Sequence, residues 1–164
     1  MRTFATFVLA AAALGGCAQE KTLSVSDAWV RLAAVPGRPA AAYFTIHGGP
    51  ADATLINVST DVAVRTEMHE MKMGGGNGAQ NGAQNGAENG AQNGAMTMDA
   101  MEQVRVPALK DLRFAPGGKH VMLFDVDPSV KPGGQIAVML TFADGVRIQQ
   151  QAAVVGAGDP APKE

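Results

Sequence analysis

The chain of 164 residues contains a single cysteine, Cys17, and few aromatic side chains. One cysteine excludes a disulfide within one chain. If its sulfur carries a lipid, a thiolate metal site is excluded as well, and any metal must then be held by histidine, methionine or carboxylate groups. Basic residues form no block or aromatic-rich patch, which argues against a nucleic-acid partner. The sequence also lacks a Ser-His-Asp arrangement, paired carboxylates and a phosphate-cradling loop, so nothing in it indicates an enzyme.

The N-terminus carries the features of a secretory signal. Met1 and Arg2 precede an apolar stretch over residues 4–14, and residues 14–17 read Leu-Gly-Gly-Cys. The apolar stretch is too short to span a bilayer, and this order predicts a lipoprotein signal over residues 1–16 with lipid attached to Cys17. An ordinary cleaved signal that leaves Cys17 free is the alternative. We expect a tether over residues 17–22 and a membrane-anchored protein that faces the periplasm, on either the inner or the outer membrane.

From Leu23 onward the sequence has the pattern of short β-strands. Strand-like segments rich in β-branched and aromatic residues occupy residues 41–46, 62–66, 103–106, 120–126 and 135–142. Pro-Gly and Gly-Gly pairs separate them, and Asp144-Gly145 predicts a hairpin. No amphipathic helix of ten or more residues is evident. These patterns predict one all-β domain, a sandwich or a barrel, over residues 23–154, followed by a disordered tail at 155–164.

A tandem repeat of Asn-Gly-Ala-Gln units occupies residues 77–94. A four-residue period with Asn-Gly in every unit suits neither a helix nor an alternating strand. The repeat has almost no apolar surface to bury, so it is predicted to be a flexible surface loop. A stalk or a partner-binding loop is the alternative.

Methionine is abundant, and six of the nine methionines lie between residues 68 and 101. Several of the six adjoin glycine-rich segments, where we expect little core for them to fill. His120 and Met122 are two residues apart, so on a strand their side chains share one face, and His69 and Met71 repeat this spacing. Thioether sulfur together with imidazole suits Cu(I), whereas zinc normally recruits thiolates or three histidine or carboxylate ligands.

The spacing of these residues resembles the periplasmic copper chaperone PCu(A)C family. The family pattern is His, ten residues, Met, 21 residues, His-x-Met, and the part from Met98 to His120 and Met122 matches it. Between His69 and Met98 there are 28 residues, 18 too many, and the repeat at 77–94 is 18 residues long. Removing the repeat therefore restores the family spacing. Other stretches similar to the family are Asp27–Arg31, Ala42–Phe44, Glu67–Glu70, Pro116–Met122 and Leu140–Gly145.

The resemblance covers roughly residues 23–154 and implies a cupredoxin-like Greek-key β-sandwich with an exposed Cu(I) site. The implied ligands are His69, Met98, His120 and Met122. The implied role is delivery of copper to the Cu(A) centre of cytochrome oxidase. The partner would be the subunit that carries Cu(A), a thioredoxin-like copper assembly protein, or both. Possible accessory ligands are Met71, Met73, Met96 and Met101, for which packing at loops or edges is the alternative.

Three other functions are weighed against copper delivery. A copper buffer or resistance protein would sequester the ion, and the sequence does not separate this from a chaperone. A copper redox protein of the blue-copper type needs a cysteine ligand, but the only cysteine is the expected site of lipid attachment. A structural surface lipoprotein would use the repeat as its functional segment.

Lengthening the loop between His69 and Met98 from ten to 28 residues costs about 0.9 kcal/mol in closure entropy, so the site is expected to survive the insertion.

Overall fold

The computed structural model describes residues 21–73 and 96–163, and all regular elements in these ranges are β-strands. The predicted signal peptide, Cys17 and the repeat lie outside the described residues. The strands are β1 (Ser24–Arg31), β2 (Ala40–His47), β3 (Ala53–Ser59), β4 (Ala63–Met73), β5 (Met96–Met101), β6 (Val104–Val106), β7 (Asp111–Phe114), β8 (Lys119–Val126), β9 (Gln135–Phe142) and β10 (Arg147–Val155). Within the described ranges, no helix has the length and hydrophobicity needed to cross a bilayer.

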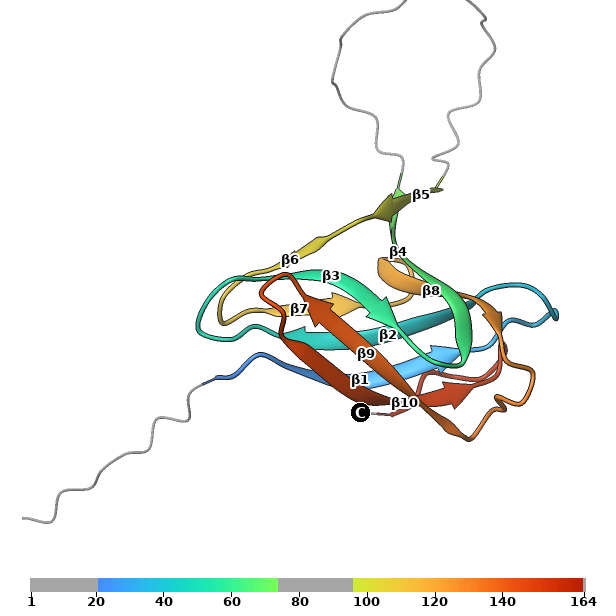
Figure 1. Ribbon diagram of the computed structural model, residues 1–164. Helices are drawn as coiled ribbons and strands as arrows, with labels where there is room; N and C mark the ends of the chain where they lie inside the picture. The colour runs from blue at the N-terminus through green and yellow to red at the C-terminus, as the bar shows by residue number, and fades with distance from the viewer. Residues whose placement is uncertain (1–20, 74–95, 164) are drawn as a thin grey trace, which may run out of the picture.

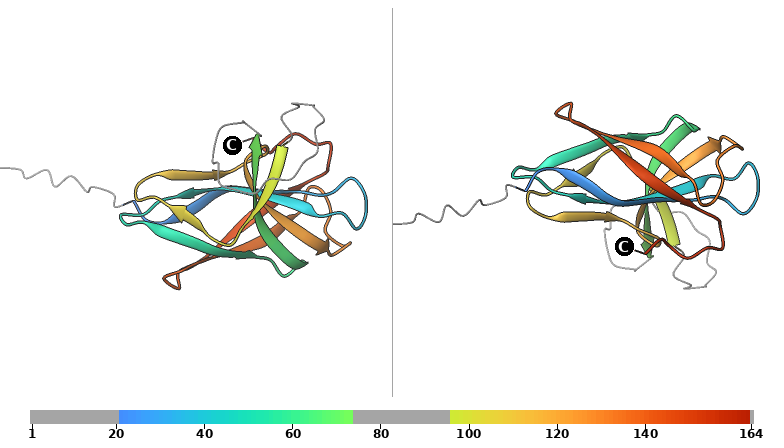
Figure 2. Two further views of the ribbon diagram at one scale, coloured as in Figure 1. Left: turned by 90° about the horizontal axis from the view of Figure 1, so that it is seen from above. Right: turned by 90° about the horizontal axis from the view of Figure 1, so that it is seen from below.

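The ten strands form one continuous sheet in the order β5-β4-β8-β7-β2-β1-β10-β9-β3-β6. Most neighbours are antiparallel, while β1 with β10 and β7 with β8 are parallel. The sheet curls around a common interior, so that β9 and β10 lie across from β2 (Figures 1 and 2). The expected all-β, single-domain fold is confirmed, and hydrogen bonds join its layers into one barrel-like sheet.

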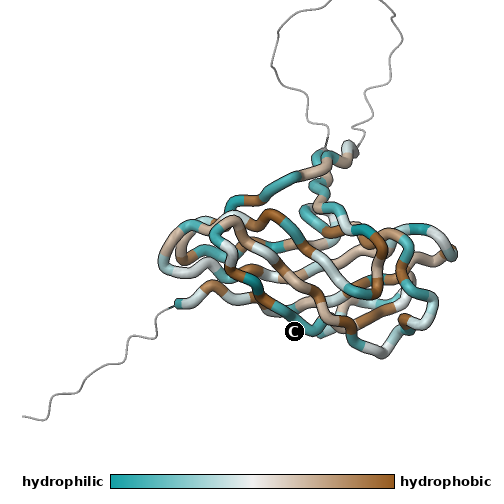
Figure 3. The backbone as a smooth tube through the Cα atoms, in the orientation of Figure 1, coloured by the Kyte–Doolittle hydropathy of each residue, from teal (hydrophilic) through white to brown (hydrophobic). Residues whose placement is uncertain are grey.

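The core is built by alternation along the central strands. In β8 the side chains of Val121 and Leu123 are buried, and in β9 every second residue from Ile136 to Phe142 faces inward. Hydrophobic and hydrophilic segments are interspersed along the backbone (Figure 3). Burying each large apolar side chain contributes about 1.5–3 kcal/mol. Because Val121 and Leu123 point into the core, His120 and Met122 must lie on the other face of β8.

The chain beyond β10 returns to β1. The backbone carbonyl of Asp159 accepts a hydrogen bond from Arg31 Nη2 at 3.0 Å, and its carboxylate accepts one from the Gly156 N–H at 2.7 Å. The Arg31 guanidinium also lies 4.9 Å from the centre of the Trp29 ring. The segment expected as a tail therefore begins with the last residue of β10, Val155, and is bonded to β1 at Asp159.

β4 and β5 form a hairpin that extends well beyond the strand predicted at 62–66. Its register runs from Met68 opposite Met101 to Met73 opposite Met96. The methionines expected beside loops thus lie on two paired strands. Residues 74–95, 22 in number, connect the strands, and 18 of them are the repeat. The remaining four would be a usual length for a hairpin loop, which agrees with the expectation that the repeat is an insertion between two paired strands.

Deleting residues 77–94 is expected to stabilise the fold. Shortening the connection from 22 to four residues reduces closure entropy by up to about 1.5 kcal/mol, from (3/2)RT ln(22/4). Chemical denaturation of the deletion variant measures the change, with a Gly/Ser segment of the same length in place of the repeat as the control. The Gly/Ser control should have the same free energy of unfolding as the wild type. A deletion variant that is less stable than the wild type would contradict the prediction.

Candidate metal centre

The centre of the candidate site is a histidine pair across β4 and β8. His69 and His120 are directly opposite each other in this antiparallel pair, so their side chains share one face. The two rings are 5.9 Å apart between centroids and inclined by 28°. Because an imidazole nitrogen binds a metal at about 2 Å, as in zinc sites, rings this close can bind one ion between them.

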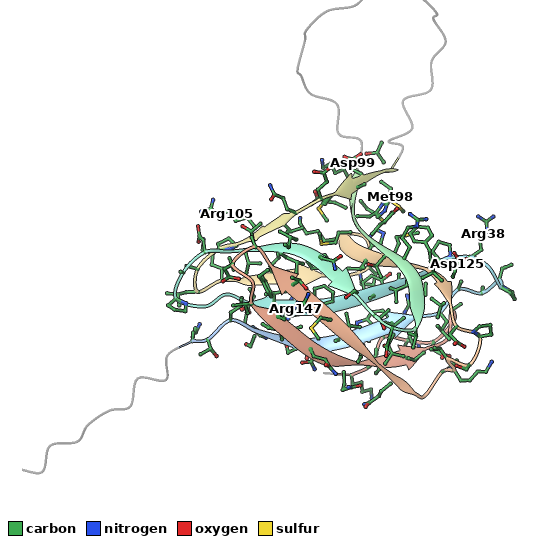
Figure 4. The ribbon with its side chains drawn as sticks, in the orientation of Figure 1. Arg38, Met98, Asp99, Arg105, Asp125 and Arg147 are labelled. Carbon is green, nitrogen blue, oxygen red and sulfur yellow. The ribbon has the colours of Figure 1, made fainter. Side chains whose placement is uncertain are left out.

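The same face carries both predicted methionine ligands. Met122 follows His120 by two residues on β8 and lies opposite Glu67. On β5, Ala100 is opposite His69 and Met98 is opposite Met71, which makes Met98 a diagonal neighbour of His69. Met98 is 49% exposed and lies on the β4–β5 hairpin (Figure 4). The four predicted ligands therefore lie on one face of three adjacent strands, β5, β4 and β8.

The four accessory candidates separate into different positions. Met71, opposite Met98, belongs to the face of the histidines. Met101 is opposite Met68, on the other face, and both pack in or against the core, where Met68 is only 6% exposed. Met73 and Met96 pair at the last described position of the hairpin. The register thus adds Met71 to the candidate site and directs Met101 away from it.

His120 is oriented by the turn that precedes β8. Its Nδ1–H donates to the Gly118 carbonyl at 3.0 Å, which leaves the lone pair on Nε2. The same carbonyl accepts the backbone N–H of Met71 at 3.2 Å. The turn is closed by a hydrogen bond from Gly118 N–H to Ala115, and Gly117 has a φ of +80°. Proline followed by a glycine with positive φ is the signature of a type II turn.

His69 has one bonded nitrogen and one unbonded nitrogen. Its Nε2 lies 3.1 Å from Glu67 Oε2, and a carboxylate can only accept, so Nε2 carries the proton. Its Nδ1 is buried and has no hydrogen-bond partner among the described residues. A buried nitrogen lone pair without a partner is unfavourable, and a metal ion would satisfy it. Sequence alternation could have indicated Glu67, which precedes His69 by two residues on the same face.

Ion pairs surround the site without determining its register. Glu70 pairs with Lys119 across β4 and β8, and Lys72 with Asp99 across β4 and β5 at 3.0 Å. The hydrogen bond from Lys72 to Asp99 raises the pKa of that lysine. The Lys72–Asp99 pair is exposed and the Glu70–Lys119 pair is partly exposed, and surface pairs of this kind each contribute little to stability. The backbone ladder and the buried face beneath it therefore hold the strands in register.

The donor types present restrict the metal that could bind. The described residues include no group of three or more His, Cys, Asp and Glu side chains placed to hold a metal ion. Imidazole with thioether is a soft donor set that suits Cu(I). The third histidine, His47, ends β2 and lies elsewhere, with its Nδ1 2.9 Å from Asp111 and its Nε2 2.8 Å from Ser26.

Replacing Gly117 by alanine is expected to lower the free energy of unfolding by about 1–2 kcal/mol, because its positive φ is unfavourable for an L side chain. An added Cβ would meet nothing within 4 Å, so the effect is purely conformational. Gly118→Ala is the matched control, since its φ is ordinary and the nearest atom to its Cβ would be 3.6 Å away. Denaturant unfolding checks both variants, and equal stabilities would refute the role of the turn.

Comparisons with known proteins agree with this architecture. A family model described as "Putative lipoprotein LpqE-like" matches residues 23–89 and 79–154, and the two matches overlap inside the repeat. A curated relative, "Putative lipoprotein Lxx21020" from Leifsonia xyli subsp. xyli, is 31% identical over 127 residues. That alignment covers 77% of this chain and 66% of the relative, so the chain spans slightly less than two thirds of the relative's length.

Solved structures share the fold at low sequence identity. The copper-bound PCuAC domain from PmoF2 has a TM-score of 0.59 at 17% identity, over 84% of this chain and 95% of that domain. The solution structure of CuI-DR1885 from Deinococcus radiodurans has a TM-score of 0.52 at 23% identity, over 87% of this chain and 85% of that one. These structures establish the likeness of fold, and the family model covers nearly the whole described domain. The chain belongs to the LpqE-like lipoprotein family.

Proposed function

We propose that the protein binds one Cu(I) ion through His69, Met98, His120 and Met122 on the outer side of the membrane and passes it to another protein. The observation that carries this proposal is the register of β5, β4 and β8, which puts all four residues on one face. Each imidazole also has one nitrogen that bonds within the fold and one left for a ligand. The fold of the copper-bound PmoF2 domain and of CuI-DR1885 supports copper as the metal.

The donor set fits a carrier that must release its ion. Imidazole and thioether groups are neutral, so they favour Cu(I) without the strong hold of thiolates. His120 is 5% exposed, whereas Met98 is 49% exposed. The nitrogen side of the site is therefore enclosed and the Met98 side is open. Ligands of an acceptor would enter from the open side and replace the thioethers one at a time, so that no free ion is formed.

The inserted repeat leaves this arrangement intact. Met98 is positioned by strand pairing with Met71, and the insertion lies beyond the last described pair, Met73 with Met96. Closure entropy of the longer connection therefore affects hairpin formation and not the distances among ligands once the hairpin has formed. The effect on affinity should be smaller than the loop length alone suggests.

The acceptor in this proposal is the Cu(A) centre of cytochrome oxidase, reached directly or through a thioredoxin-like assembly protein. The lipoprotein family supports a location at the membrane, where such an acceptor resides. A buffer that sequesters copper is the second candidate, because the same site would serve it. The kinetics of copper release distinguishes a protein that delivers copper from a buffer that sequesters it.

Anaerobic titration should show one Cu(I) per chain, and X-ray absorption should count two sulfur and two nitrogen ligands. His120→Ala and Met122→Ala should each weaken binding by more than the ~10–100-fold typical of groups that only support ligands. His47→Ala and Met139→Leu are matched controls on other parts of the sheet and should bind as the wild type does. If the two ligand variants retain wild-type affinity, the assigned site is wrong.

Copper-loaded protein should transfer its ion to an isolated Cu(A) domain faster than the ion dissociates spontaneously, and a chelator that captures the free ion measures the rate of that dissociation. Direct exchange predicts a transfer rate that rises with acceptor concentration, because donor and acceptor must meet. The Met98→Leu variant tests the open side of the site, and its transfer rate should change more than that of Met139→Leu. A rate equal to spontaneous dissociation at all acceptor concentrations would favour the buffer.

A further inference from the structure

We infer that Glu67 is a positioning residue for His69, which binds copper through Nδ1 while Glu67 holds Nε2. This inference rests on the proposed function and specifies how one of its four ligands binds. It makes the two histidines of the site unequal. His120 would bind through Nε2, because its Nδ1–H is given to the Gly118 carbonyl.

The contacts of the His69 ring carry the inference. Glu67 Oε2 is 3.1 Å from Nε2, which places the proton there and the lone pair on Nδ1. Nδ1 is buried without a partner among the described residues, although the side chain as a whole is 14% exposed. Copper can bind to Nδ1 without breaking any existing hydrogen bond of the ring. Binding through Nε2 would require the carboxylate to leave.

Glu67 is itself held in place by a chain of contacts along the same face. Its carboxylate also pairs with the Arg65 guanidinium. That guanidinium lies 3.8 Å from the centre of the Phe124 ring, and Phe124 is the residue opposite Arg65 on β8. Phe124, Arg65, Glu67 and His69 therefore form a continuous series that ends at the metal side of the site. Because Arg65 holds one oxygen of the Glu67 carboxylate, the other oxygen can fix the orientation of the His69 ring.

The chemistry favours support of the histidine over direct binding. A carboxylate oxygen is a hard donor and a poor ligand for Cu(I). A hydrogen bond from the imidazole N–H to a carboxylate orients the ring and makes its other nitrogen more basic. Glu67 would thus strengthen the bond from His69 to copper without entering the coordination sphere. Met122, opposite Glu67, supplies the soft donor at that level of the sheet.

The experiment uses Ag(I), whose nuclei have spin one-half, as a substitute for Cu(I), with the protein labelled with ¹⁵N. Scalar coupling between silver and the imidazole nitrogens identifies which nitrogen of each histidine is bound. We expect coupling to Nδ1 of His69 and to Nε2 of His120. Coupling to Nε2 of His69 would overturn the inference and leave the proposed function standing. Absence of coupling to both histidines would overturn the proposed function as well.

Three variants test the role of the carboxylate. Glu67→Ala should weaken Cu(I) binding ~10–100-fold and shift or divide the silver coupling at His69. Glu67→Gln should restore both, because its amide oxygen can still accept from Nε2–H. Glu70→Ala is the matched control, since it removes the same charge from β4 next to His69 but pairs with Lys119 instead. Wild-type affinity and wild-type coupling in Glu67→Ala would refute the inference.

Discussion

The pairing of His69 with His120 across β4 and β8 is the constraint on which the site depends. A slip of one residue would turn Met68 outward and His69 inward, because side chains alternate between faces. Burial of Met68, Val121 and Leu123 on the inner face opposes that slip. The exposed ion pairs nearby are too weak to set the register. Packing of the core and placement of the candidate metal-binding face therefore both follow from the register of β4 and β8, and a mutation that loosens the core packing should disturb the candidate site.

The part of the site that sequence can predict is the part that depends on alternation within one strand. His120 and Met122 share a face for that reason, and the strands at 120–126 and 135–142 were evident from their β-branched residues. The extension of β4 through Glu-Met-His-Glu-Met-Lys-Met was not evident, because these residues have weak strand preference and are strands only through pairing with β5 and β8. Alternation along β4 puts Glu67 on the face of His69, but its hydrogen bond to Nε2 depends on side-chain rotamers, and the contact of His120 with the Gly118 carbonyl depends on a turn.

Exposure increases in one direction across the candidate site. His120 is 5% exposed, the His69 side chain 14%, and Met98 49%. The nitrogen donors are fixed by hydrogen bonds to the fold, while the sulfur donors are held by the register of their strands. Such a division would suit the proposed carrier, because the enclosed part would retain the ion and the open part would allow another protein to approach. It also explains why the methionines are concentrated on a protruding hairpin (Figure 1).

The position of the repeat at the end of the β4–β5 hairpin has a consequence for how this chain can change over evolutionary time. The repeat is built of four-residue units, three Asn-Gly-Ala-Gln and one Asn-Gly-Ala-Glu followed by Asn-Gly, so gain or loss of a unit changes the length of the connection by four residues. Gain or loss of units alters only the connection beyond Met73 and Met96 and leaves every strand pair in place. A chain with a different number of units would therefore keep the candidate metal-binding residues in the same three-dimensional positions, and a spacing rule counted along the sequence would overlook the longer versions.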